Sequence, residues 1–303
     1  MDTPSARPIH NIVTARPTIE GGGIRVNRPF PIPGADWFDP FLLLDEMAPT
    51  VHPPGKSGGV PPHPHRGFET VTYVFEGEIE HTDSAGNNDV IGPGDVQWMT
   101  AGDGIVHSEM LSEKLQREGG TSHGLQLWVN LPAQLRRTTP RYQGFRSHDM
   151  PVVNADGWSA HLVAGELGGE QGPAESHTPI TYAIVQIEPG ATARIPVADG
   201  YTALAYVVDG RALAKDERRT IEPQQLVVFE STTGDVVLHA ETERVRCLVL
   251  AGQPIAEPMQ RYGPFVMNTT DELAEAIDDF NAGRMGQLTA TGGVKRMHQP
   301  TTN

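Results

Sequence analysis

Short apolar runs separated by glycine- and proline-rich turns recur along most of the chain. Between Thr70 and Phe75, apolar Val71 and Tyr73 alternate with other residues, which is the period of two that a β-strand imposes on its faces. The 33 glycines and 26 prolines among 303 residues lie between such runs rather than in one low-complexity stretch. Short strands joined by tight turns predict an all-β protein.

A second series of such runs follows between residues 180 and 252, and its turns are similar to those of the first series. Asp209-Gly210 follows a strand-like run as Glu76-Gly77 does, and Ile221-Glu-Pro-Gln-Gln225 corresponds to Ile91-Gly-Pro-Gly-Asp95. Self-similarity of this kind indicates a repeated architecture. The sequence therefore predicts two similar all-β halves.

The expected domains are residues 1–140 and residues 141–289, followed by a flexible polar tail over residues 290–303. The first 25 residues are polar and end in three glycines, so we interpret them as an arm that leads into the first strand. Residues 133–160 are rich in Arg, Pro, His and Asp and are interpreted as a linker and the entry to the second half.

One helix is expected near the end of the chain. Thr269-x-x-Glu272 is a capping-box pattern, and apolar residues follow it at helical spacing. Gly283 is a plausible helix stop. The apolar positions of this helix are Leu273, Ala276, Ile277 and Phe280.

Composition excludes several classes of function. The net charge of −15 opposes contact with phosphate backbones, so no direct nucleic-acid binding is expected. A single cysteine, Cys247, permits neither an intrachain disulfide nor a cysteine-based zinc site, and its apolar neighbours predict a buried thiol. No basic-then-apolar leader opens the sequence, and no apolar stretch approaches the ~20 residues that span a bilayer. We expect a cytoplasmic monomer that is not attached to a membrane.

Two closely spaced pairs of potential metal ligands stand about forty positions apart, His63-Pro-His65 and His107-Ser-Glu109. In an extended strand, residues i and i+2 point to the same face of the sheet. Each pair therefore directs two side chains to one side, and in a closed barrel all four can converge. Three imidazoles and a carboxylate suit a divalent first-row metal. Spacing alone leaves ordinary polar residues as the alternative, since the chain has 12 histidines.

Several longer segments resemble the pirin family of the cupin superfamily. Pro62–Tyr73 is similar to the first cupin motif as pirins have it, and Gly92–Glu109 is similar to the second. Phe38–Glu46, His123–Pro132 and Gly263–Thr269 resemble further pirin segments. The resemblance covers roughly residues 25 to 285 and is weakest in the second half. It implies two tandem cupin (jelly-roll) β-barrels with a short C-terminal helix.

The resemblance also implies a ligand set for one divalent ion. Iron(II) is the expected metal, with Mn, Ni, Cu, Co or Zn as alternatives. Generic cupins often place a ligand four residues after the second histidine, which makes Glu69 an alternative carboxylate. His81 and His123 are expected not to bind the metal, although either could contact a residue that does. By the pirin pattern, the ligands are His63, His65, His107 and Glu109.

The function that the resemblance implies is an oxidoreductase of the quercetin 2,3-dioxygenase type. Such an enzyme opens the ring of a flavonol with O2 and releases carbon monoxide, and Glu109 is the expected proton acceptor. A small aromatic or enediol-like substrate would contact an apolar wall, for which the candidates are Phe68, Trp98, Met99 and Met110. One alternative is a metal- or redox-dependent regulator that binds a transcription factor or a metabolic enzyme. Another is an oxygenase of a different small metabolite.

Overall fold

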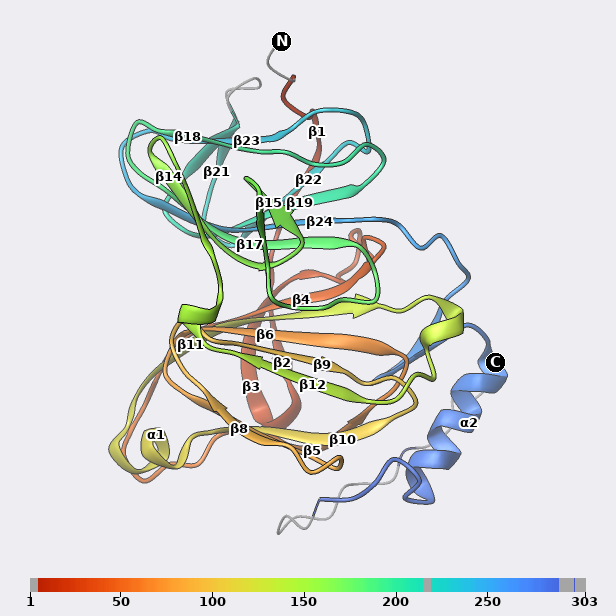
Figure 1. Ribbon diagram of the computed structural model, residues 1–303. Helices are drawn as coiled ribbons and strands as arrows, with labels where there is room; N and C mark the ends of the chain where they lie inside the picture. Colours follow the sequence, from red (N-terminus) through yellow and green to blue (C-terminus); the bar gives the residue numbers. More distant parts are fainter. Residues whose placement is uncertain (1–4, 215–218, 289–296, 298–303) are drawn as a thin grey trace. The chain divides into compact units, whose positions relative to one another are not determined.

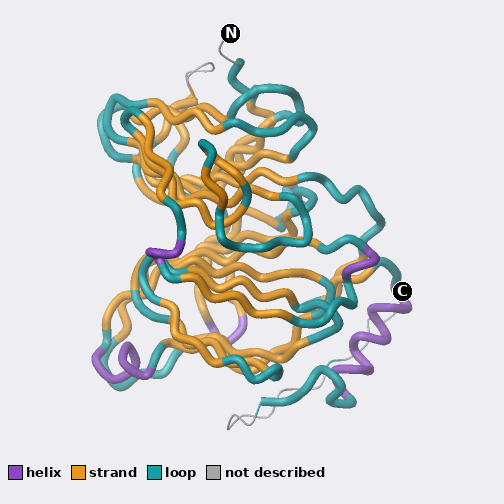
Figure 2. The backbone as a smooth tube through the Cα atoms, in the orientation of Figure 1, coloured by secondary structure: helices purple, strands orange, loops and turns teal. Residues whose placement is uncertain are grey.

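Strands dominate the computed structural model, which describes residues 5–214, residues 219–288 and Met297 (Figures 1 and 2). The all-β prediction is confirmed. Apart from Met297, the predicted tail over residues 290–303 lies outside the described residues.

The chain forms two compact units, each built from separated segments. We call the unit that contains the histidine pairs the first unit; it comprises Pro17–Val26, Leu42–Ser147 and Ile255–Asn303. The second unit comprises Met1–Arg16, Asn27–Phe41 and His148–Pro254. The chain passes between the units after residues 16, 26, 41, 147 and 254. The domain limits given above stay a prediction.

The first unit contains a seven-stranded and a four-stranded sheet. The order in the larger sheet is β12 (Arg141–Phe145), β9 (Val96–Thr100), β6 (Phe68–Glu76), β11 (Gly120–Asn130), β4 (Phe41–His52), β3 (Ile24–Phe30) and β2 (Arg16–Glu20). The order in the smaller sheet is β5 (Gly59–His65), β10 (Ile105–Leu111), β7 (Ile79–Asp83) and β8 (Asn88–Ile91).

The second unit repeats this plan of seven and four strands. Its larger sheet has the order β1 (Ile9–Thr14), β22 (Gln225–Phe229), β19 (Thr202–Asp209), β24 (Val245–Gly252), β17 (Ile180–Ile187), β14 (Trp158–Ala164) and β13 (Val152–Ala155). Its smaller sheet has the order β18 (Thr192–Ile195), β23 (Val236–Ala240), β20 (Ala212–Ala214) and β21 (Arg219–Ile221). Alternate residues of these strands supply one buried apolar core. The predicted internal repeat is thereby confirmed.

Two segments interpreted as non-strand connections contain strands. The expected N-terminal arm holds β1, which pairs antiparallel with β22 more than 200 positions away, and β2 at one edge of the first unit's larger sheet. The expected linker over residues 133–160 holds β12, which pairs with β9. Both interpretations were wrong. These strands are stabilised by pairing with strands that are distant in sequence, and the residues of one segment do not reveal such a partner.

The C-terminal helix α2 (Thr270–Asn281) is confirmed, together with its capping box. The Thr269 hydroxyl accepts a hydrogen bond from the backbone N–H of Glu272, and the Glu272 carboxylate accepts one from the N–H of Thr269. A second, shorter helix, α1 (Glu113–Glu118), was not expected; the Ser112 side chain caps it. None of the described helices is long and apolar enough to cross a membrane.

The single cysteine is buried in the core of the second unit. Cys247 on β24 is 0% exposed, and burial raises the pKa of its thiol to about 12. Because the thiolate is the reactive form, we expect no reaction of the native protein with Ellman's reagent at pH 8. One thiol per chain should react once guanidinium unfolds the protein. Rapid labelling of the native protein would contradict this burial.

Candidate metal centre

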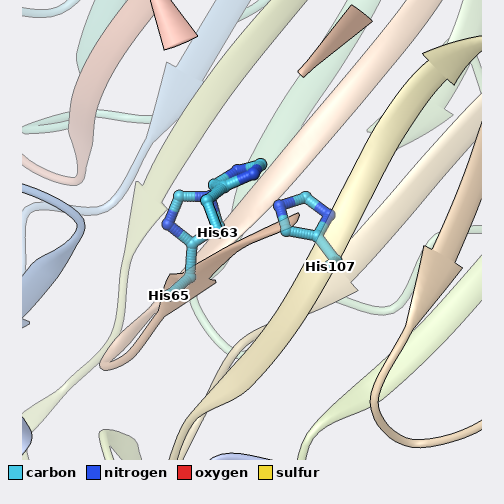
Figure 3. A group of neighbouring side chains, drawn as sticks. All are labelled: His63, His65 and His107. Atoms are coloured by element: carbon cyan, nitrogen blue, oxygen red, sulfur yellow. The ribbon is translucent and has the colours of Figure 1, made fainter. Parts of the chain in front are cut away.

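Two neighbouring strands bring three histidines together in the first unit. His63 and His65 are two residues apart on β5, so their side chains leave the same face. His107 lies on β10, which pairs antiparallel with β5 so that His107 stands opposite His63. Figure 3 shows the three imidazole rings turned toward one another. The structure therefore brings together three of the four predicted ligands.

The distances between the rings fit a single metal ion. One nitrogen from each ring lies within 4.8 Å of the other two, and the Nε2 atoms of His63 and His65 are 3.1 Å apart. Two ligands bonded to one ion at right angles, with bonds of about 2.1 Å, are about 3.0 Å apart. Neutral imidazoles of this arrangement suit a first-row divalent metal.

The surroundings of the rings favour the neutral form that a metal requires. Burial lowers the pKa of His63, His65 and His107. The Nδ1–H of His63 donates to the carbonyl oxygen of Pro61 at 2.9 Å, which leaves the lone pair on Nε2. Nε2 of His107 is buried and has no hydrogen-bond partner in the described part of the chain. A nitrogen lone pair without a partner is the feature that a bound ion would satisfy.

Glu109 lies near the three histidines, but its oxygens are not among the atoms grouped within 4.8 Å. Its negative charge raises the pKa of His63 and so partly offsets the effect of burial. The carboxylate accepts hydrogen bonds from the Thr72 hydroxyl at 2.9 Å, from Nε2 of Gln126 at 2.8 Å and from Nε2 of Gln97. These three donors, which we call the Glu109 cradle, fix the carboxylate beside the rings.

The alternative carboxylate, Glu69, lies elsewhere. Glu69 and Thr72 are three residues apart on β6, so their side chains lie on opposite faces of the strand. Thr72 lies on the face toward Glu109, to which it donates a hydrogen bond. Glu69 is buried and accepts a hydrogen bond from the Thr100 hydroxyl at 2.7 Å. This placement favours Glu109 over Glu69 as the carboxylate of the site.

Aromatic side chains border one side of the histidines. The Phe68 ring lies 5.0 Å from the His65 ring, and Trp128 lies 5.1 Å from His65 and 4.3 Å from Phe68. The guanidinium carbon of Arg261 lies 4.6 Å from the centre of the Trp128 ring. These contacts form an apolar border with a cation at its edge.

The proposed apolar wall is only partly found at the site. Phe68 contacts His65 as expected, but Trp98 follows Gln97 on β9 and therefore faces away from the Glu109 cradle. Met110 likewise alternates away from Glu109. Met99 lies two residues after Gln97, on the same face of β9 as the cradle, and packs with Ala101 and Ile105. A proposal based on proximity in sequence could not separate the two faces of these strands.

Sequence reasoning missed four residues of the site: Thr72, Gln97, Gln126 and Trp128. One signal was available, because Gln126 is a polar residue within the apolar run from Leu125 to Leu131. A glutamine in a buried strand needs partners for its amide group. The register that brings Thr72 opposite Gln97 could not be seen without the strand pairing.

The C-terminal segment fastens the end of strand β5. Arg66, which follows His65, forms a buried ion pair with Asp279 of α2 at 2.8 Å and donates to the backbone oxygen of Asp103 at 2.7 Å. Gly67 comes next with a φ of +88°, and a Cβ atom there would lie 1.8 Å from the backbone oxygen of Val266. Only glycine permits this close approach, which holds the segment around Val266 against the ligand strand.

Comparisons with known proteins agree with this architecture. The Pirin family model matches residues 23–129, and the model of the Pirin C-terminal cupin domain matches residues 182–286. A pirin-like protein of Caulobacter vibrioides is 41% identical over 281 residues, which is 92% of this chain and 99% of that protein. Human Pirin is 37% identical over 286 residues, 93% of this chain and 95% of that one.

A solved structure is also closely similar. The crystal structure of a quercetin 2,3-dioxygenase from Acinetobacter baumannii superimposes with a TM-score of 0.87 at 36% identity, and the match covers 93% of this chain and 99% of the other. The family assignment rests on the two cupin domains and on the relatives, and the arrangement of the histidines agrees with it. The chain belongs to the pirin family.

Proposed function

We propose that the protein is a metal-dependent dioxygenase of the quercetin 2,3-dioxygenase type. The observation that carries the proposal is the convergence of three imidazoles, two of them buried, next to a carboxylate that three donors hold in place. We assign His63, His65, His107 and Glu109 to one divalent ion, with iron(II) as the expected metal. The similarity to the Acinetobacter baumannii dioxygenase structure supports this reaction class.

Each group of the site has a role in the proposed reaction. A divalent ion held by His63, His65, His107 and Glu109 would supply the Lewis acidity that lowers the pKa of a substrate hydroxyl. Glu109 accepts the hydroxyl proton, as a general base within hydrogen-bond reach does. The Glu109 cradle orients the carboxylate for that transfer. Phe68 and Trp128 provide apolar surface for a flat aromatic substrate. Ring opening with O2 then yields the cleaved product and carbon monoxide.

The test is oxygen consumption by iron-loaded protein with quercetin. We expect oxygen uptake together with loss of the flavonol absorption band, and neither should occur with metal-stripped protein or with the His63→Ala variant. A protein that is fully loaded with iron and consumes no oxygen with quercetin would contradict the flavonol assignment. A panel of catechols and enediols would then identify another oxygenated substrate.

A regulatory role is the second candidate, for a chain that is 37% identical to human Pirin. In this case the oxidation state of the metal would change the local charge and thereby the affinity for a partner protein. Iron(III)-loaded protein should then retain a partner that metal-stripped protein releases. The expected monomer can be checked in the same samples by light scattering.

A further inference from the structure

Two buried side chains on β7 lie behind His107. Strand β10 pairs with β5 on one side and with β7 on the other, so His107 stands opposite both His63 and Asp83. His81, two residues before Asp83, stands opposite Glu109. The side chains of His81 and Asp83 are both 0% exposed. Burial of a histidine with a carboxylate costs desolvation free energy. A functional contribution of this pair would explain why the fold accepts that cost.

Asp83 determines which nitrogen of His81 carries the hydrogen. Its Oδ2 atom lies 3.0 Å from Nε2 of His81 and 2.8 Å from the amide Nδ2 of Asn87. Its Oδ1 atom accepts from the backbone N–H groups of Ala85 and Asn87 at 2.9 and 3.0 Å. With donors at both oxygens, the carboxylate acts as an acceptor, so the His81 Nε2–H must donate to it.

In the neutral form of the imidazole, a hydrogen on Nε2 of His81 leaves Nδ1 as an acceptor. This Nδ1 atom lies 3.5 Å from Nδ1 of His107. Tyr142 fixes the orientation of the His81 ring by stacking on it, with ring centres 4.5 Å apart and an angle of 26° between the planes. His107 therefore donates from Nδ1 and keeps its lone pair on Nε2, the buried nitrogen without a partner.

We propose that Asp83 and His81 are positioning residues that select the nitrogen which His107 presents to the metal. The order Asp83 to His81 to His107 is a chain of two hydrogen bonds in which each acceptor fixes the tautomer of the next ring. The proposal rests on the metal centre assigned under Proposed function. It extends the metal centre to His81 and Asp83 of β7, a strand to which no metal ligand is assigned.

Two substitutions, one at His81 and one at Asp83, test the proposal. His81→Phe keeps a ring against Tyr142 and removes the acceptor for His107. Asp83→Asn keeps the shape but replaces one carboxylate oxygen with a donor, which favours the opposite tautomer of His81. Each should weaken cobalt(II) binding by about 10- to 100-fold, as other changes behind metal-bound histidines do. Competition with a chromophoric chelator measures this affinity.

The same unit contains a matched control. His123 and Glu46 form another buried histidine–carboxylate pair, with Nε2 and Oε1 also 3.0 Å apart, and His123 contacts the aromatic ring of Phe75. The variants His123→Phe and Glu46→Gln lose an equivalent pair without touching His107. Their cobalt affinity should stay within about 3-fold of the wild type, which is far below the change expected for the His81 variant.

Nitrogen-15 NMR of the metal-stripped wild type tests the tautomers without any substitution. His81 should carry its hydrogen on Nε2, and His107 should carry its hydrogen on Nδ1. The opposite tautomer of His107, or unchanged cobalt affinity in folded His81→Phe and Asp83→Asn, would overturn the proposal. Equal weakening by all four variants would overturn it too. Wild-type protein that binds no cobalt would refute the metal centre itself.

Discussion

Replacement of His107 by alanine is expected to abolish stable metal binding. His107 is fully buried and supplies a nitrogen that has no hydrogen-bond partner in the described part of the chain. Without it, only the two histidines of β5 and Glu109 remain for the ion, and the affinity should fall at least about 100-fold, the upper range for changes next to a metal ligand. Elemental analysis should find about one ion per chain in the wild type and almost none in the variant.

The control for this experiment is His148→Ala. The side chain of His148 is 83% exposed and belongs to the second unit, so this variant should retain the metal content of the wild type. Equal metal content in His107→Ala, with an intact circular dichroism spectrum, would show that the ion binds elsewhere.

Replacement of Glu109 by glutamine is expected to separate catalysis from metal binding. The change removes the proton acceptor, and loss of a general base typically costs about 10²- to 10⁴-fold in rate. The amide would also bring N–H donors against the Glu109 cradle, whose three groups donate to the carboxylate. Because the three histidines remain, metal binding should persist, but it should weaken by at least about 10-fold, since Glu109 is itself assigned to the ion. Stopped-flow decay of flavonol absorbance and chelator competition measure the two effects.

Glu69→Gln is the matched control for the second prediction. Glu69 is another buried carboxylate of the first unit, but it contacts Thr100 rather than the cradle. Its variant should retain the metal and turn over the flavonol within about 3-fold of the wild type, since groups away from the reacting atoms contribute little to proton transfer. If Glu69→Gln lost activity and Glu109→Gln did not, the two carboxylates would have to exchange roles.

Local signatures in the sequence predicted the all-β class, the C-terminal helix and the two histidine-containing pairs, whereas the cupin barrels and the ligand set came from the resemblance to pirins. The alternation around Val71 and the capping box at Thr269 depend on neighbours within a few positions, and so do the two histidines of β5. The pairing of β1 with β22 and the cradle around Glu109 depend instead on strands that meet only in the folded chain. His81 lies between these cases: a contact with a metal ligand was considered from the sequence, but identifying His107 as its partner required the register of β7 against β10.

The ion pair between Arg66 and Asp279 has a consequence for biosynthesis. Strand β5 leaves the ribosome early, whereas Asp279 is synthesised more than 200 residues later, after the whole of the second unit. The segment around Val266 that packs against Gly67 also arrives only then. Until translation is almost finished, the nascent chain has its histidines but lacks the support beside them. The histidines of β5 should therefore reach their final placement only at the end of synthesis.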